Sequence, residues 1–428
     1  MAVTMFGTLI LLLVLNVPVA VSIGVAAILG VVTGGLPINP VVVAQRMFTS
    51  ADSFPFMAIP FFMLAGGLME YGGISRRLVN LASSLVGGFR GGLGLITILA
   101  SAFFGAISGS NPATVAAIGG IMVPEMIRKG YPPAYAGAIA AAGGTLGVVI
   151  PPSIPMITFG VVAGVSIGDL FMAGFGPGIF IALTISVVVV ALSARMDIPL
   201  EPKRTFSDFL SALKDSVPAI VMPLIILGGI YGGIFTPTEA GAVAVVYSFV
   251  VSVFIYRELT LPKLKTVIIR AGISTSVVFF VIATSQSLSW LITISRVSQA
   301  IADSILSITS QPFLLITLVN VILLVFGIFL ETQAIILLLA PLFLPIVTGV
   351  GMDPLMLGII MVVNTSVGMI TPPMAVNLFV AVSLVKEHNV TIEKITRYIL
   401  PFLIVEIVDI FIVSNLPLLS VGILKLVK

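Results

Sequence analysis

The sequence predicts an all-helical protein that crosses a lipid bilayer many times. Of its 428 residues, 59% are apolar and only 9% are Asp, Glu, Lys or Arg, whereas a soluble domain carries roughly 25% charged residues. Residues 91–124, 130–168 and 354–385 hold no charge at all, and a helix needs about 20 apolar residues to span a bilayer core. None of these stretches alternates strictly over about ten residues, as spanning strands would. This composition argues against a soluble enzyme and against a nucleic-acid-binding protein.

Apolar stretches of sufficient length predict nine membrane-spanning segments. They cover residues 4–33, 53–70, 132–165, 167–195, 216–236, 238–257, 266–289, 354–385 and 395–416. Two amphipathic segments, 206–213 and 294–306, are expected to lie along the membrane surface. With these spans alternating, sixteen Lys and Arg residues fall on one side and four on the other, namely Arg46, Arg296, Lys425 and Lys428. Because basic residues concentrate in cytoplasmic loops, the N-terminus is expected in the cytoplasm and the C-terminus outside.

Two further apolar segments, 92–127 and 311–349, are expected to enter and leave the membrane on the same face. In the first, residues 91–107 and 113–127 are each short for a crossing, and Ser108-Gly109-Ser110-Asn111-Pro112 lies between them. Gly loosens a helix and Pro lacks a backbone donor. Non-helical backbone persists at membrane depth only where it is buried in protein or lines a wet cavity. Alternation alone allows a full pair of spans here, but a re-entrant hairpin with its tip near the midplane fits the short helices better.

The chain repeats its pattern of Pro and Gly at an offset of 221 residues, as from Pro124 to Pro345. The other matched pairs are Pro133 with Pro354, Gly147 with Gly368, Pro151-Pro152 with Pro372-Pro373, and the tip Ser110-Asn111 with Glu331-Thr332. The first copy starts from the cytoplasmic face and the second from the outer face, so the two are expected to be inverted copies. Inverted repeats with interrupted helices are typical of secondary transporters, which bind their substrate where the interruptions meet.

The interruptions are residues 143–153 and 364–373, each of which ends in or contains Pro-Pro. Two consecutive prolines remove two donors and free the carbonyls one turn earlier. Those carbonyls, with Ser, Thr and Asn oxygens, form a cage of hard oxygens that suits Na⁺, whereas a proton relay would need buried Asp, Glu or His. The plainer interpretation is that each Pro-Pro pair only kinks a packed helix. We expect sodium as a coupling ion, no cofactor, and no thiolate metal site, because the chain has no Cys.

Motifs along essentially the whole chain carry a resemblance to one transporter family. They are Ala51-Asp52-Ser53-Phe54-Pro55, Ala58-Ile59-Pro60-Phe61-Phe62, Gly66-Gly67-Leu68-Met69, Gly87-Gly88-Phe89-Arg90-Gly91-Gly92, Ser108-Gly109-Ser110, Pro151-Pro152-Ser153, Gly232-Gly233-Ile234-Phe235-Thr236-Pro237-Thr238-Glu239-Ala240 and Thr371-Pro372-Pro373. With them the chain resembles the large membrane subunit of tripartite ATP-independent periplasmic (TRAP) transporters, of the DctM and SiaM type. The resemblance implies a sodium-coupled, elevator-type importer of organic acids in the bacterial inner membrane. It also implies two partners, a small membrane subunit and a periplasmic substrate-binding protein.

The resemblance also implies site residues, several of them through their backbone carbonyls. A first sodium site is expected at Ser108, Asn111, Gly147, Ile150 and Pro152, and a second at Gly327, Gly368, Thr371 and Met374. The substrate is expected near Ser110, Ser153, Thr332, Asn364 and Thr365, where helix N-termini favour a carboxylate. Asn111 is the polar side chain between Gly109 and Pro112, so its oxygen is expected to be an ion ligand.

The expected division of the chain separates a transport unit from a scaffold. Residues 1–90 form scaffold spans, 91–165 the first transport repeat, 166–310 scaffold spans with interfacial helices, 311–386 the second transport repeat, and 387–428 a C-terminal scaffold span. In an elevator mechanism, the two repeats would move as one body against this scaffold.

Three other functions remain open at this stage. A sodium-coupled organic-anion carrier that works without partner subunits has a similar broken-hairpin design. A channel is disfavoured because inverted interrupted repeats indicate alternating access. An intramembrane enzyme lacks support, since no HExxH, GxSxG or CxxC motif occurs, and no GxxxxGK[ST] phosphate loop is present to use ATP. Among substrates, general likeness favours sialic acid, with C4-dicarboxylates next.

Overall fold

The computed structural model describes residues 1–15, 17–34, 38–86, 91–196, 198, 200, 205–308 and 311–427. The regular elements of these residues are all helices, as predicted. The first part contains α1 (Ala2–Val14), α2 (Val19–Thr33), α3 (Val41–Ala51), η1 (Phe54–Met57), α4 (Ala58–Tyr71), α5 (Ile74–Leu85), α6 (Gly92–Ser108), α7 (Asn111–Arg128), α8 (Pro133–Gly144), α9 (Leu146–Val149) and α10 (Ile154–Ala163). The second part contains α11 (Ile167–Ser193), α12 (Phe206–Tyr231), α13 (Pro237–Val250), η2 (Val251–Ile255), α14 (Leu261–Ile294), α15 (Val297–Ile308), α16 (Pro312–Phe329), α17 (Thr332–Gly349), α18 (Pro354–Gly368), α19 (Val376–Leu384), η3 (Lys386–His388), α20 (Ile392–Asn415), η4 (Pro417–Leu419) and α21 (Val421–Val427). Gly87, Gly88, Phe89, Arg90, Lys203, Arg204 and Lys428, used above for a motif or for the charge count, lie outside the described residues.

Nine helical segments within the described residues are long and apolar enough to cross a bilayer. They are Phe54–Tyr71, Pro133–Ala163, Ile167–Ser193, Phe206–Tyr231, Pro237–Ile255, Leu261–Ile294, Pro312–Phe329, Thr332–Gly349 and Ile392–Asn415. Seven coincide with predicted spans, and the other two are the arms of the hairpin predicted at 311–349. The protein is therefore a multi-pass membrane protein.

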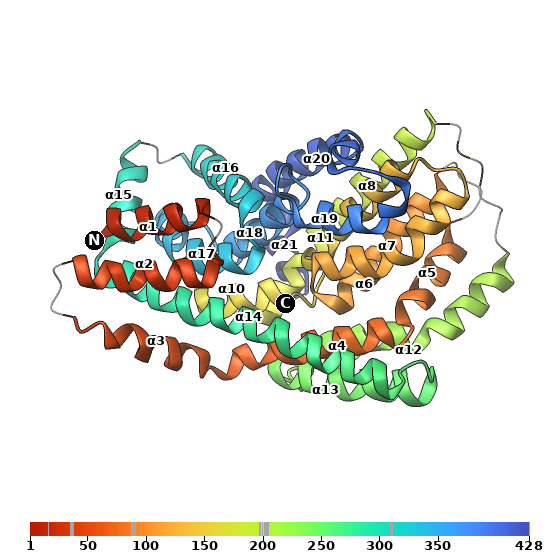
Figure 1. The fold of residues 1–428 in the computed structure, drawn as a ribbon, viewed down its shortest axis with the longest axis horizontal. Helices are drawn as coiled ribbons and strands as arrows, with labels where there is room; N and C mark the ends of the chain where they lie inside the picture. Colours follow the sequence, from red (N-terminus) through yellow and green to blue (C-terminus); the bar gives the residue numbers. More distant parts are fainter. Residues whose placement is uncertain are drawn as a thin grey trace.

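The span or broken span predicted at 4–33 is interrupted. Residues 2–33 form two short helices, α1 and α2, which pack against each other, because Pro18 cannot continue α1. Met1 Sδ lies 3.5 Å from Ser295 Oγ at the end of α14, so the N-terminus shares an end of the molecule with the turn before α15 (Figure 1). The charge count placed Arg296, in that turn, outside. The predictions of a cytoplasmic N-terminus and of an outer Arg296 therefore cannot both hold, and the orientation of the chain stays a prediction.

The two predicted surface helices have different outcomes. Residues 206–213 do not form a separate helix, since α12 runs from Phe206 to Tyr231. A capping box starts it: the Thr205 hydroxyl accepts from the Asp208 N–H, and the Asp208 carboxylate accepts from the Thr205 N–H. The segment at 294–306 does become a helix of its own, α15, which packs against α17.

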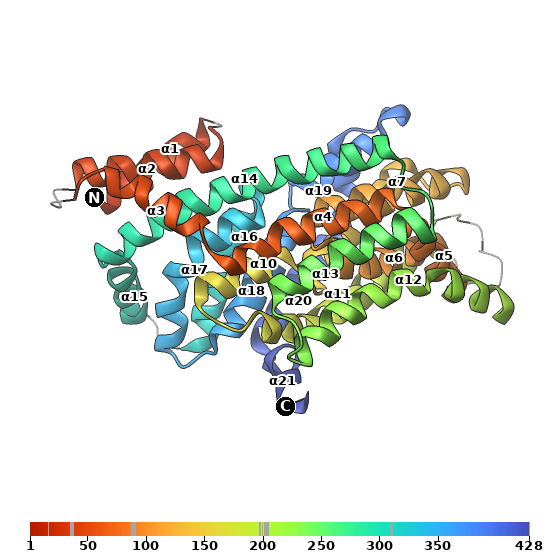
Figure 2. The same cartoon turned by 90° about the horizontal axis from the view of Figure 1, so that it is seen from below.

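The contacts among the described helices form two groups. One group contains α2, α3, α4, α5, α12, α13 and α14, with α4 packed against α13 and α14 (Figure 2). The other contains α6–α10 and α16–α19, and α11 and α20 pack directly against these elements. The predicted domain division places α11 and α20 in the scaffold, and that division stays a prediction. The groups meet mainly where α5 packs on α6 and where α14 and α15 pack on α17.

Elements recur at the offset of 221 residues that the sequence predicted. The arms α7 (Asn111–Arg128) and α17 (Thr332–Gly349) are each 18 residues long and start 221 residues apart. The helices α8 and α18 begin at the matched residues Pro133 and Pro354. The Ser366 hydroxyl donates to the carbonyl of Thr145, its own repeat partner, across 2.6 Å. The two halves therefore contact each other directly at equivalent positions.

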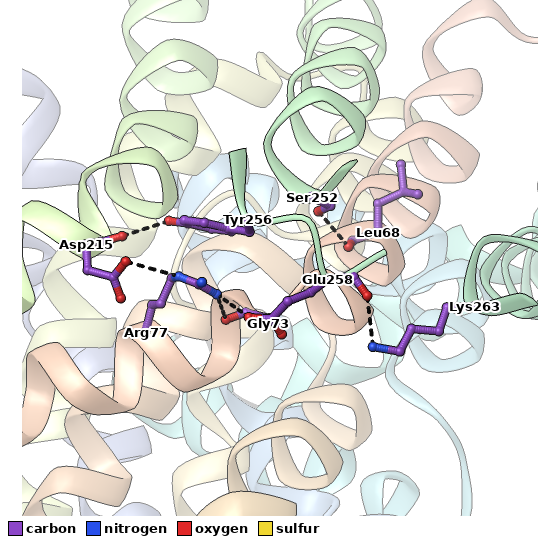
Figure 3. Close-up of polar contacts among 8 residues, drawn as sticks. All are labelled: Leu68, Gly73, Arg77, Asp215, Ser252, Tyr256, Glu258 and Lys263. Carbon is purple, nitrogen blue, oxygen red and sulfur yellow. Dashed lines mark hydrogen bonds and ion pairs between the residues drawn. The ribbon is translucent and has the colours of Figure 1, made fainter. Parts of the chain in front are cut away.

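A cluster around Arg77 joins the ends of four helices on the side that the charge count places in the cytoplasm (Figure 3). The Arg77 guanidinium on α5 donates to Glu258 at 2.8 Å and to Asp215 on α12 at 3.4 Å. It also lies over the Tyr256 ring, 3.6 Å from its centroid. Burial raises the pKa of Tyr256 to about 12, and its hydroxyl donates to the Asp215 carbonyl. Lys263 on α14 donates to the Glu258 carbonyl, and the cluster thus fixes α5, α12, η2 and α14 to one another.

Candidate functional site

The tip of the first hairpin lies against the first interrupted helix with no space between their backbones. A Cβ added to Gly147 would lie 2.5 Å from the Ser110 carbonyl oxygen and 2.6 Å from Thr114 Oγ1. Gly109 has φ +58°, and a Cβ there would lie 3.2 Å from the Pro152 carbonyl oxygen. Only glycine permits these approaches. The hairpin tip therefore brings carbonyl and hydroxyl oxygens directly onto the break between α9 and α10.

Asn111 bridges three elements at this contact. Its side chain is 1% exposed. Its Oδ1 accepts from the Val148 N–H at 2.9 Å, and its Nδ2 donates to Ser366 Oγ at 2.7 Å. The first bond links the first hairpin to the first interrupted helix, and the second links it to α18 of the second repeat. In the second repeat, the partners of Asn111 and Val148 are Thr332 and Met369, and Thr332 Oγ1 lies 3.6 Å from Met369 Sδ.

The five residues expected at the first sodium site lie on these contacting segments. Ser108 is buried, and its hydroxyl is 3.0 Å from the Thr114 hydroxyl. Ile150 is buried and would contact a Cβ at Gly178 of α11. The peptide bond Pro151–Pro152 is cis, as is Pro372–Pro373 in the second break. Carbonyl and hydroxyl oxygens are the hard ligands that a small monovalent cation prefers, so the residues present fit Na⁺.

The four residues expected at the second sodium site lie together in part. Gly327 and Gly368 are in backbone contact: a Cβ on Gly368 would lie 2.6 Å from Gly327 Cα. Thr371 donates to the Val367 carbonyl at 2.9 Å. Met374 is 48% exposed and lines an apolar cavity of about 660 Å³ with residues of α1 and α16. The second break is thus open on one side, whereas the first is covered by α11.

Both hairpin tips meet in one small cavity of about 40 Å³. Its lining residues come from the two tips, the two interrupted helices and α4, which contributes Met63: Met63, Gly109, Ser110, Asn111, Pro112, Val148, Ile154, Pro155, Glu331, Thr332, Gln333 and Met369. Among the residues expected at the substrate, Ser110 and Thr332 line it. Ser153 is buried next to Ile154, and its hydroxyl has no hydrogen-bond partner.

Asn364 and Thr365 lie away from this cavity. Asn364 Nδ2 donates to Asn320 Oδ1 at 2.9 Å, and Thr365 Oγ1 donates to the Met361 carbonyl. The Asn364 carbonyl is instead a neighbour of Gly327, which places these two residues beside the second expected sodium site.

Two larger cavities continue from the central one along the boundary between the two groups of helices. The first, of about 230 Å³, shares Met63, Ser110 and Ile154 with it and is lined also by Glu70 and Arg270. The second, of about 380 Å³, shares Glu70 with the first and is lined by Arg76, Glu258 and Lys263. This succession runs from the hairpin tips to the side that the charge count places in the cytoplasm.

Three buried polar side chains on helices around this site were not identified from the sequence. Gln333 lines the central cavity, and its Oε1 accepts from Thr158 at 2.6 Å. Glu406 and Asp409 on α20 are 0% and 1% exposed. Two acids three residues apart inside an otherwise apolar span are the signal that could have identified them.

Broken helices and polar hairpin tips that meet inside a bundle of apolar helices define a class of protein, the membrane transporters. The comparisons narrow this class. Residues 6–419 match the DctM component of tripartite ATP-independent periplasmic transporters. The chain belongs to this family, and it is therefore a transporter permease component and not an enzyme.

Named relatives agree with this assignment. The isethionate TRAP transporter permease protein DctMQ of Oleidesulfovibrio alaskensis is 42% identical over 96% of this chain, which spans 65% of that relative's length. The C4-dicarboxylate TRAP transporter large permease protein DctM of Pseudomonas aeruginosa is 40% identical over 89% of this chain and 88% of its own length. The fold is similar to that of the Alcanivorax borkumensis YdaH transporter, with a TM-score of 0.61 and 15% identity over 87% of this chain and 86% of that one.

Proposed function

We propose that this chain is the large permease of a sodium-coupled importer of small organic acids. The observation that carries the proposal is the meeting of two hairpin tips and two broken helices around one cavity, lined by hydroxyl and amide groups together with the Glu331 side chain. Cages of carbonyl, hydroxyl and amide oxygens suit Na⁺, and the described residues contain no group of three or more His, Cys, Asp or Glu side chains able to hold another metal. The Na⁺ gradient would then drive uptake.

The two groups of helices support an elevator-type mechanism. In this proposal the layer of α6–α11 and α16–α20 moves as one body, with both hairpins re-entrant and the repeats inverted. The layer of α2–α5 and α12–α14 stays fixed, held by the Arg77 cluster. The cavities that lead from the tips past Arg270 to Arg76 and Lys263 support an inward-facing arrangement. The sixteen-to-four distribution of basic residues supports placing that end in the cytoplasm.

The substrate class follows from the size and polarity of the site together with the relatives' names. Those relatives are permeases for isethionate and for C4-dicarboxylates. Sialic acid, favoured by the sequence on general likeness, has no support in these names. Hydroxyl and amide groups of Ser110, Thr332 and Gln333 lie where they could donate hydrogen bonds to a small carboxylate or sulfonate, although the cavity of about 40 Å³ must widen to admit it. Arg270 in the adjoining cavity would attract such an anion.

The family assignment supports two partners, a small membrane subunit and a periplasmic binding protein that delivers the acid. One relative carries both component letters in its name, DctMQ, and this chain spans 65% of its length. Scaffold helices expose apolar side chains such as Leu224, Val246 and Phe254, which a membrane subunit or lipid would cover. The membrane is then the bacterial inner membrane, where a periplasmic protein can reach the outer face.

The test is uptake into proteoliposomes that contain this chain and its small subunit. Isethionate, succinate and N-acetylneuraminic acid, each presented with a cognate binding protein, would be compared under an inward Na⁺ gradient. We expect uptake of isethionate or succinate and none of N-acetylneuraminic acid. Equal uptake of free acid without any binding protein would favour a stand-alone carrier, and uptake that does not saturate would favour a channel.

A further inference from the structure

We propose that Glu406 binds a proton that moves with the substrate, so that this permease couples uptake to H⁺ as well as to Na⁺. The proposal rests on the proposed transport function and adds a second coupling ion to it. It starts from a carboxylate at a position that neither the hairpin tips nor the sodium cages use.

Glu406 lies beside Thr145, where α8 meets α9, and does not line the substrate cavity. It is 0% exposed, and its Oε1 accepts from the Thr145 hydroxyl at 3.3 Å. Its Oε2 has no hydrogen-bond partner. A charged carboxylate with a free oxygen at membrane depth is costly, because neither water nor a counter-ion offsets its desolvation. A bound proton removes that charge.

The groups that face Glu406 supply no positive charge. The helices packed against α20 are α8, α11, α16, α18 and α19. Their titratable side chains among the described residues are Tyr135 on α8, which contacts Tyr398 two turns from Glu406, and Asp169 at the start of α11. On α20 itself, the neighbour is Asp409, 1% exposed, whose Oδ2 accepts from the Thr184 hydroxyl at 2.5 Å. A second acid one turn away makes an unprotonated Glu406 less favourable still.

A proton fits this position better than a metal ion does. A metal ion requires several oxygens turned toward one point. The Thr145 and Thr184 hydroxyls instead point their hydrogens at acceptors: Thr145 lies 2.7 Å from the Ala142 carbonyl as well as near Glu406, and Thr184 donates to Asp409. A proton needs only the one free oxygen, Oε2. Binding converts the carboxylate and one H⁺ into a neutral carboxyl group, and release to the cytoplasm restores the carboxylate.

A chain of hydrogen bonds connects this carboxyl group to the first hairpin tip. Asn111 Nδ2 donates to Ser366 Oγ at 2.7 Å, and Ser366 Oγ donates to the Thr145 carbonyl at 2.6 Å. Thr145, at the junction of α8 and α9, completes the connection: its hydroxyl lies 3.3 Å from Glu406 Oε1 and shares its hydrogen with the Ala142 carbonyl at 2.7 Å. A change in the charge of Glu406 is therefore felt at the tip where sodium and substrate are expected. Through these contacts, protonation of Glu406 can affect transport.

Infrared spectroscopy of the purified permease complex tests proton binding without any substrate. The wild type should show a carboxylic-acid C=O band that titrates with pH and whose midpoint moves when Na⁺ replaces choline. Glu406→Gln should lose the band, and Glu393→Gln, in the exposed first turn of the same helix, should keep it. Thr145→Val should keep the band and lose its response to Na⁺, while Thr145→Ser should behave as wild type. An unchanged spectrum in Glu406→Gln would overturn the proposal.

Vesicle uptake tests coupling. At a fixed Na⁺ gradient, uptake by the wild type of the acid selected above should fall by up to about tenfold per unit rise in external pH, since one proton is bound. Pyranine trapped inside should report acidification during uptake. In Glu406→Gln, the Na⁺ dependence should remain while the pH dependence and acidification disappear. If uptake by Glu406→Gln and by wild type responds alike to pH, the proton site is refuted. If uptake by the wild type does not depend on Na⁺, the proposed sodium coupling is refuted instead.

Discussion

Gly368 offers the sharpest perturbation of the second break, because its lack of a side chain lets two backbones touch. A Cβ at this position would lie 2.6 Å from Cα, 2.7 Å from C and 2.8 Å from O of Gly327, whereas ordinary van der Waals contact begins near 3.4 Å. All three neighbours are backbone atoms, so no flexible side chain can move aside. Gly368→Ala must therefore displace the second hairpin from α18 by about 0.8 Å, the difference between 3.4 Å and 2.6 Å.

This displacement sets the expected loss of Na⁺ affinity. Overpacking a well-packed site costs about 1–3 kcal/mol, and about 1.4 kcal/mol corresponds to a factor of ten in an equilibrium constant. If carbonyls on both sides of this contact bind Na⁺, the apparent Na⁺ affinity should fall by roughly ten- to hundredfold. The backbone separation, rather than any lost side-chain ligand, is the cause.

The assay is the Na⁺ concentration dependence of uptake in proteoliposomes, with protein incorporation measured in parallel. Gly120→Ala on α7 is the matched control, because a Cβ there meets nothing within 4 Å. Gly147→Ala, the repeat partner, should disturb the first site through the Ser110 carbonyl. A correctly inserted Gly368→Ala permease with the parental Na⁺ dependence would refute the assignment of this contact to an ion site.

Three further predictions concern single side chains. Asn111→Ala leaves the Val148 N–H without its acceptor, so it should weaken apparent Na⁺ affinity by roughly ten- to hundredfold, the equivalent of about 1–3 kcal/mol for a buried polar group. Thr332→Val should leave the first site closer to normal, and equal effects of the two variants on Na⁺ dependence would contradict this prediction. Arg77→Met removes the 2.8 Å ion pair with Glu258 and should lower the free energy of unfolding by about 1–3 kcal/mol, measured as a lower melting temperature. Arg76→Met, at an exposed neighbour, should leave the melting temperature unchanged. Equal decreases in the two variants would refute the role of the cluster. Arg270→Gln removes a cation from the 230 Å³ cavity. It should slow uptake of a dianion about fivefold more than uptake of a monoanion, since a unit charge contributes about 1 kcal/mol in water. If this difference does not shrink at high salt, its cause is not electrostatic.

The sequence predicted the parts of this protein that depend on chain-local chemistry. Gly109 and Pro112 mark a hairpin tip, and the paired prolines mark the breaks, because Gly and Pro change the backbone wherever they stand. The repeat at an offset of 221 residues is visible in the sequence, and the hydrogen bond between the matched residues Thr145 and Ser366 agrees with it.

Long-range packing accounts for what the sequence did not predict. Nothing in the pattern of residues 4–33 distinguishes one long span from the folded pair α1 and α2, since both bury apolar surface. The helices α11 and α20 read as ordinary spans, and only their contacts show that they pack on the repeats. The family resemblance implied that Asn364 lies near the substrate. Its side chain turns toward Asn320, a direction that the sequence alone did not indicate.

Replacement of the coupling ion tests the central claim most directly. Proteoliposomes that contain the permease, its small subunit and the acid-loaded binding protein would receive an inward gradient of either Na⁺ or choline at equal osmolarity and pH, without ATP. Neutral oxygen cages at the two breaks predict saturable uptake with Na⁺ and background uptake with choline. Uptake that continues unchanged in choline would contradict the account.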